Sequence, residues 1–349
     1  MRRIIKRRKI PIRLIICVMS VLFMLTAAIT TMLVFKNQIE NVVRQMDVLT
    51  AKEYDSYYVM IVGDQSSSFW KSVYQSAKAA GEEENALVEF MGDELASTFS
   101  KEELMQIAIA SKVDGIFLEA DESASLTSLI DEAVAQGIPV ITVLGDNTAS
   151  NRLSYVGVNN YNLGKMYGKQ VLELANKEKC NVLVLMSNKE DWGQNILYAS
   201  IYETMKTVTN AENSIHMSSI KIEEDNAFAA EESIRDIFVK EGSIPDILIC
   251  LNELNTTCAY QAVVDYNKVG DVNILGYYNS DVIIKAVERN VIYSTIKVNT
   301  DQIGRYLIEA MKEYQITGHT NEYYTVDTTL ITADNLKEFM VGGGDGKEE

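Results

Sequence analysis

The fold is decided by one stretch, Val113–Val143, which reads VDGIFLEADESASLTSLIDEAVAQGIPVITV. It opens near a short apolar run, Gly115–Leu118, and ends in a second one, Pro139–Leu144. Between them, Leu126–Gln136 has apolar residues at helical spacing. A strand, a helix and a strand in this order predict a βαβ unit, in which the strands are parallel and the helix covers one face of the sheet.

The same alternation extends in both directions along the chain. Toward the N-terminus, strands are predicted at 57–63 and 86–91 and helices at 69–80 and 102–111. After a break near Tyr155–Asn160 the pattern restarts, with helices at 163–176, 196–208, 228–240 and 256–266, strands at 181–186, 216–222, 246–251 and 273–277, and closing elements at 282–289, 292–298 and 302–314. One sheet seldom holds so many units, so the expected fold class is α/β with two doubly wound parallel-sheet lobes.

A membrane anchor is expected before this body. The first 13 residues carry seven positive charges and no acid, and Leu14–Phe35 follows as 22 residues without a charge. A helix of that length measures about 33 Å, enough to cross a hydrocarbon core of about 30 Å. The basic flank places residues 1–13 in the cytoplasm and the main domain outside, as in a single-pass protein of the cell membrane.

Two alternatives to the uncleaved anchor stay open. Thr26-Ala27-Ala28 is a candidate signal-peptide cleavage site, and Cys17 is a candidate for lipidation. The linker at 36–56 carries a heptad-like stripe that suits a short helix or a coiled-coil stalk, namely Ile39, Val42, Met46 and Leu49. At the other end, residues 341–349 are glycine and charge and are expected to be disordered.

Charge and composition exclude several classes of function. The whole chain of 349 residues has a net charge of −17, and the part after residue 13 holds 25 basic and 49 acidic residues, so nucleic-acid binding is not expected. With two histidines, a multi-histidine metal site is excluded. Cys180, Cys250 and Cys258 lie in apolar stretches, which predicts buried free thiols, with one disulfide left open. The motifs of hydrolases, dinucleotide enzymes and metalloproteases are absent, so no enzyme activity, cofactor or metal is expected.

A ligand site is predicted in the loops that follow the strands. In open α/β sheets, ligands bind beyond the carboxyl ends of the strands. That rule selects the loops 64–71, 119–123, 144–147, 187–195, 252–256 and 278–281. Phe69-Trp70 and Trp192 stand there among polar side chains, and aromatic faces with hydrogen-bonding neighbours suit a sugar. The alternative is that Phe69 and Trp70 begin a helix and pack on the sheet.

Three segments together resemble the type I periplasmic binding proteins of the ribose/galactose-binding kind. They are the stretch quoted above, SYVGVNNYNLGKMYG at Ser154–Gly168, and ILGYYNSDVIIKAVERNVIYSTIKVNTDQIG at Ile274–Gly304. The resemblance covers about residues 57–340. It implies that two lobes close on a ligand at a three-strand hinge, with lobe 1 at about 57–157 and 300–322 and lobe 2 at about 158–297 and 327–340.

The resemblance also implies ligand-binding residues. The family's first aromatic loop aligns with Ser67, Ser68, Phe69 and Trp70, and its contact asparagine aligns with Asn252. Elsewhere the chain departs from the family. The usual Asp-Arg pair falls on Leu144-Gly145 with Asp146 one position late, the contact aspartate on Tyr278 with Asn279 next, the contact glutamine on Val298 with Asn299 next, and the second-lobe arginine near Asn195.

The function expected from this resemblance is capture of a small solute, a monosaccharide or derivative, outside the cytoplasm. The membrane partner would be a sensor histidine kinase or an ABC importer permease. This chain has fewer charged side chains at the family's sugar-contact positions. A non-sugar ligand, or a degenerate pocket used only for protein interaction, is therefore the alternative.

Overall fold

The computed structural model describes residues 32, 36, 53–93, 99–175, 179–189, 191–207, 215–224, 226–239 and 244–340. Residues 1–54 and 55–349 are separate compact units. Nearly all of the predicted anchor and linker, and the tail at 341–349, lie outside the described residues. Within the described ranges, none of the helices combines the length and apolar character that a membrane crossing requires.

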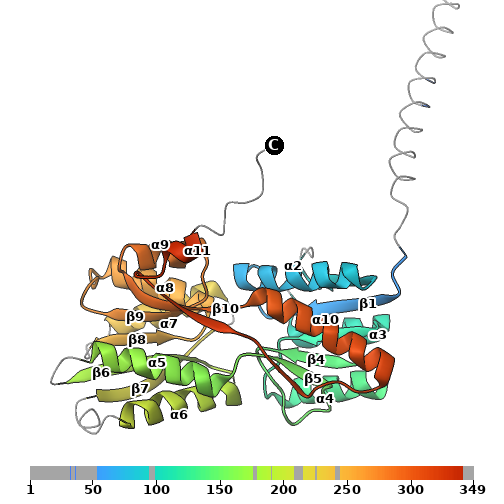
Figure 1. Ribbon diagram of the computed structural model, residues 1–349, viewed down its shortest axis with the longest axis horizontal. Helices are drawn as coiled ribbons and strands as arrows, with labels where there is room; N and C mark the ends of the chain where they lie inside the picture. Colours follow the sequence, from blue (N-terminus) through green and yellow to red (C-terminus); the bar gives the residue numbers. More distant parts are fainter. Residues whose placement is uncertain are drawn as a thin grey trace, which may run out of the picture. The chain divides into compact units, whose positions relative to one another are not determined.

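The first sheet is fully parallel and forms lobe 1. Its strand order is β11-β5-β4-β3-β1-β2 (Figure 1). The strands are β1 (Ser56–Ile61), β2 (Ala86–Phe90), β3 (Gly115–Leu118), β4 (Val140–Val143), β5 (Ser154–Gly157) and β11 (Tyr323–Thr325). The quoted stretch therefore supplies two adjacent central strands, β3 and β4, as the βαβ pattern predicted.

The second sheet repeats this plan in lobe 2, in the order β12-β10-β9-β8-β6-β7. Its strands are β6 (Cys180–Ser187), β7 (Ile215–Ile222), β8 (Ile247–Cys250), β9 (Asn273–Tyr277), β10 (Ile292–Val298) and β12 (Thr328–Thr332). The edge strand β12 is antiparallel to β10, which corrects the expectation of purely parallel lobes. The two-lobe α/β fold itself is confirmed.

Helices flank both sheets (Figure 1). Lobe 1 has α2 (Ser68–Glu83), α3 (Lys101–Ser111), α4 (Ala124–Ala135) and α10 (Thr300–Thr317), and lobe 2 has α5 (Asn160–Leu174), α6 (Trp192–Lys206), α7 (Ala227–Val239), α8 (Glu253–Asp265), α9 (Asp281–Glu288) and α11 (Lys337–Met340). Their starts follow capping chemistry. Ser100 and Glu103 form a complete capping box at α3, and Ser67 caps α2 through Trp70 N.

The chain crosses between the lobes three times. The crossings join β5 to α5, β10 to α10 and β11 to β12. They are held side by side, because Val326 N donates to Gly157 O at 2.9 Å and Asn299 N donates to Asp327 O at 3.0 Å. The last crossing follows residue 325 and not 322, because Tyr323–Thr325 pairs with β5 and belongs to lobe 1.

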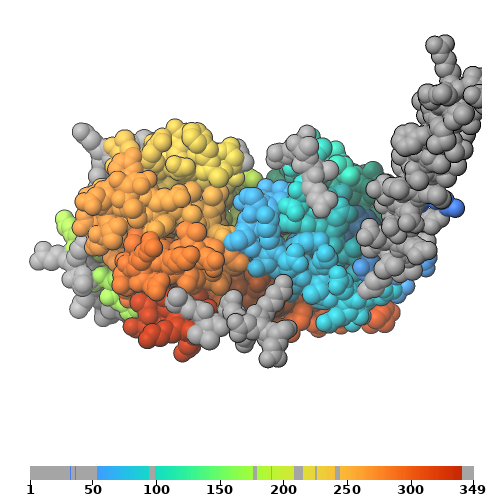
Figure 2. Space-filling model, turned by 90° about the horizontal axis from the view of Figure 1, so that it is seen from above, coloured from blue at the N-terminus to red at the C-terminus, as the bar shows by residue number. Residues whose placement is uncertain are grey.

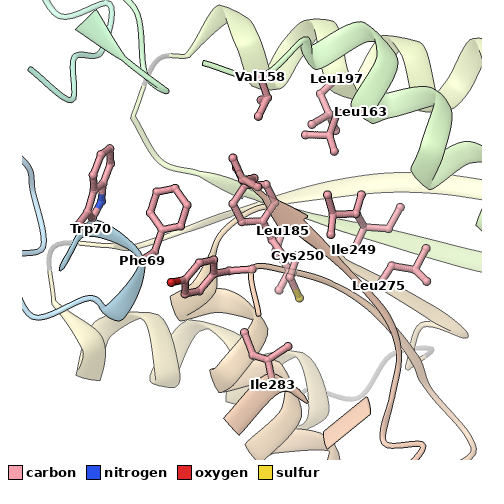
Figure 3. Packing of buried hydrophobic residues seen from close by; sticks show 14 of the residues in the cluster. Phe69, Trp70, Val158, Leu163, Leu185, Leu197, Ile249, Cys250, Leu275 and Ile283 are labelled. Carbon is pink, nitrogen blue, oxygen red and sulfur yellow. The ribbon is translucent and has the colours of Figure 1, made fainter. Parts of the chain in front are cut away.

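Apolar packing continues from one lobe into the other. One buried cluster joins residues of both sheets, and Phe69 of α2 projects toward Leu185 and Cys250 of lobe 2 (Figure 3). A second cluster lies on the other face of the lobe 1 sheet, where Ile116 and Leu118 of β3 meet Leu126 of α4. Cys250 and Cys258 are buried free thiols, and Cys180 is also buried.

Candidate functional site

A cleft of about 1470 Å³ lies between the carboxyl ends of the strands of the two lobes. All six loops selected from the sequence contribute lining residues. The volume exceeds the roughly 300–1,000 Å³ of an ordinary small-molecule pocket. Figure 2 shows one side of this junction, where the blue residues of α2 lie against orange residues of lobe 2.

The start of α2 lines the cleft and touches the opposite lobe. Ser67 Oγ donates a hydrogen bond to the Glu253 carboxylate at 2.8 Å, and Phe69 N donates to it at 3.1 Å. Ser68 Oγ donates to the same carboxylate. Both serines that the sequence placed in the ligand site therefore meet a lobe 2 side chain.

Phe69, at the start of α2, makes ring contacts with three other aromatic side chains. Phe69 and Trp70 are only 5% and 7% exposed, yet both line the cleft. The Phe69 ring lies edge-on to Tyr278 at 4.9 Å between ring centres, and it also contacts Tyr277. Both residues therefore pack on the core and also border the cleft, and their contact with a ligand stays a prediction.

Asn252 holds the lobe 2 side of the cleft. Its side-chain oxygen accepts from Asn255 N at 2.8 Å and so caps α8, and its Nδ2 donates to Glu224 at 2.6 Å. Asn255 Nδ2 donates to the same Glu224 oxygen at 2.7 Å. Asn279 lines the cleft nearby, at the start of the loop before α9.

Two cleft positions have an unusual backbone. Leu144 and Tyr278, the first residues after β4 and β9, have φ of 60° and 74°. Non-glycine residues in this left-handed region carry strain of about 1–3 kcal/mol and cluster at functional sites. Here both left-handed residues mark equivalent strand ends in the two lobes, at the positions where the chain departs from the family pattern.

Carboxylates on the lobe 1 wall were not singled out from the sequence. Glu119 accepts from Gly63 N at 2.6 Å. Burial raises the pKa of Glu119, although nearby Lys101 opposes the shift. Asp121 receives Lys101 Nζ at 3.0 Å. Burial also acts to raise the pKa of Asp121, but Lys101 and hydrogen bonds from Ser123 outweigh it, and the pKa falls.

The cleft is acidic as a whole. Its lining includes eight carboxylates and two lysines, Lys101 and Lys189. The carboxylates are those of Asp64, Glu102, Glu119, Asp121, Asp191, Glu224, Glu253 and Asp281. Glu119 directly follows β3 and Glu224 comes two residues after β7, which is the signal that could have identified these two. No pattern in the sequence shows which of them meet across the cleft.

Seven of the eleven predicted site residues line the cleft, and four do not. Asp146 pairs with Arg152 inside lobe 1, where Nη2 lies 2.8 Å from Oδ2. Trp192 begins α6 and is 63% exposed. Asn195 is exposed one position beyond Gln194, which lines the cleft instead. Asn299 caps α10 at the hinge by accepting from Gln302 N at 3.1 Å.

Comparisons with known proteins bear on the family and the fold. A family model described as a periplasmic binding protein domain matches residues 58–319. Among solved structures, the XylFII molecule is 25% identical over 79% of this chain and 98% of its own, with a TM-score of 0.67. A XylFII-LytSN complex is 24% identical over 80% and 98%, with a TM-score of 0.67. GanP, a glucose-galactose binding protein from Geobacillus stearothermophilus, is 22% identical over 80% and 98%, with a TM-score of 0.71. Among curated proteins, none matches the sequence.

Proposed function

The chain belongs to the family of periplasmic binding protein domains, and on that premise we propose that residues 57–340 bind a small sugar outside the cytoplasm by closing two lobes around it. The cleft carries this proposal. It offers hydroxyl, amide and carboxylate groups beside the aromatic side chains of Phe69, Trp70 and Tyr278. That mixture suits a ligand with a polar rim and an apolar face.

The charge of the lining narrows the ligand class. Eight carboxylates against two lysines repel an anion in a partly desolvated cleft. An uncharged sugar is therefore the proposed ligand, in preference to a uronate or a sugar phosphate. Binding without catalysis is part of the same proposal.

We further propose that residues 14–35 anchor the protein in the cell membrane and that the closed lobes are read by a membrane partner. A tether suits a lasting partnership in the plane of the membrane. On this ground a sensor kinase is the favoured partner, and an importer permease is the alternative. A solved structure of the same fold is a complex of XylFII with LytSN.

The test is thermal unfolding of residues 54–349 against a panel of neutral sugars and uronates. A ligand at about 100 times its Kd adds about 2.7 kcal/mol. For a domain of this size, that raises the Tm by about 5–10 °C. We expect a rise with at least one neutral sugar, and the uronates should give none.

Two matched asparagine variants locate the binding. Asn279→Ala, which removes a cleft amide, should abolish the Tm rise. Asn195→Ala, which removes an exposed amide outside the cleft, should leave it unchanged. Absence of any rise across the panel would refute sugar binding, and equal behaviour of both variants would refute the placement of the site.

A further inference from the structure

The N-terminus of α2 in lobe 1 is completed by a side chain from lobe 2. We propose that Glu253 is an interlobe latch, whose carboxylate stabilises the closed arrangement of the two lobes. It accepts from Ser67 Oγ at 2.8 Å, from Phe69 N at 3.1 Å and from Ser68 Oγ. All three donors belong to lobe 1, so opening the cleft breaks all three contacts at once.

A carboxylate is the group that this helix end lacks. The first N–H groups of a helix have no partner within the helix, and the positive end of its dipole favours an anion. Helix α2 has 16 residues and no acidic residue in its first turn. The side chain of its N-cap residue, Ser67, accepts a hydrogen bond from Trp70 N, whereas Phe69 N donates to Glu253. Lobe 2 thus supplies the missing anion.

The same carboxylate also stands at the start of a lobe 2 helix. Glu253 is the first residue of α8 and the acidic residue of its first turn. One charge therefore lies at the N-terminal ends of two helices from different lobes. Its favourable interaction with the N-terminus of α2 exists only when the lobes meet. The contact of Phe69 with Tyr278 and the donation of Tyr278 OH to Ser68 O at 3.4 Å reinforce the same junction.

The latch acts beside interlobe charges of both signs. Glu119 of lobe 1 lines the cleft with Lys189 and Glu224 of lobe 2, and attraction to the lysine opposes repulsion from the carboxylate. When the lobes close, the Glu253 carboxylate accepts hydrogen bonds from donors of the other lobe. Its removal should therefore shift the balance toward the open state.

The experiment measures the distance between the lobes in the full-length protein without ligand. Spin labels are placed at Ala79→Cys in α2 and Lys285→Cys in α9, both exposed, with Cys17→Ser as background. Electron–electron resonance then gives the distribution of label distances. The wild type should show a measurable closed population, with a short distance, beside the open one. E253Q, which keeps the shape and loses the charge, should lower the closed-to-open ratio by about tenfold or more.

Two further variants make the result decisive. S68A removes one donor on the lobe 1 side and leaves the Ser67 cap in place, so it should shift the ratio in the same direction by less. E203Q removes an exposed carboxylate of α6 and should leave the distribution of the wild type. If E253Q keeps the wild-type distribution, or if the wild type is already as open as E253Q, the latch is refuted. Should E253Q fail to fold, S68A decides. Because no sugar is added, this outcome is independent of the proposed ligand.

Discussion

The two tryptophans of this protein offer a direct test of how deeply the start of α2 is buried. Trp70 and Trp192 both stand in the first turn of a helix that follows a strand, and the sequence places both in the ligand site. The structure separates them. Trp70 is 7% exposed within the interlobe core cluster, and Trp192 is 63% exposed on α6.

Trp70→Ala should destabilise the protein strongly. Replacing a buried tryptophan with alanine typically costs about 3–5 kcal/mol, through lost apolar burial and the cavity left behind. The variant also loses the edge-on contact of Trp70 with Phe69, whose ring centres lie 5.3 Å apart. For a domain of this size, the Tm should fall by about 6–20 °C.

Trp192→Ala is the matched control, because the same atoms are removed from an exposed site. Its free energy of unfolding should change by no more than about 0.5 kcal/mol. Since the chain has two tryptophans, each variant also leaves one fluorophore. Emission from Trp192→Ala reports on Trp70 in the cleft, and it should be blue-shifted relative to emission from Trp70→Ala. Equal Tm losses in the two variants, or equal emission maxima, would refute the burial argument.

Two further predictions concern buried titratable groups. Burial holds the pKa of Glu119 above its ordinary value of 4.5, so the folded protein keeps a proton that the unfolded chain releases, and stability falls as pH rises from about 4.5 through the raised pKa. In urea unfolding, Glu119→Gln should therefore gain stability over the wild type as pH rises through this range, and a difference that does not vary with pH would contradict the assignment. Burial also raises the pKa of the Cys258 thiol to about 11, and that of Cys250 further, so a thiol reagent at pH 8 should label residues 54–349 only after unfolding. Fast labelling of the native protein would show that these thiols are exposed, and the urea-unfolded sample serves as the positive control.

Elements with a strong local pattern could be predicted. Four-residue strands such as β3 and β4 have every side chain buried, which a short, wholly apolar run indicates. Helix starts at Ser67, Ser100 and Asn252 carry capping residues that act within one turn. The antiparallel edge strand β12 was missed because its direction depends on how the chain crosses between lobes, and local spacing carries no record of that crossing.

Site residues were predicted less well where a long-range partner decides their role. Asp146 is drawn into a bidentate pair with Arg152, although by position it could have faced the cleft. Glu253, next to the predicted site residue Asn252, was not predicted as a site residue, because its partners lie about 185 residues earlier in the chain. The left-handed backbone at Leu144 and Tyr278 could not be predicted from the sequence, since bulky residues rarely adopt a positive φ.

The sequence alone determined the alternation of strands and helices, the division into two lobes and the loops that form the cleft. These follow from periodicity and from the rule that parallel strands end at one edge, which are properties of short stretches. Tertiary structure alone decided which side chains of those loops face the cleft and which pair with residues of their own lobe. It also decided that the carboxylate of Glu253 contacts the opposite lobe. Those outcomes depend on distances between residues far apart in the chain, and such distances exist only once both sheets have formed and met.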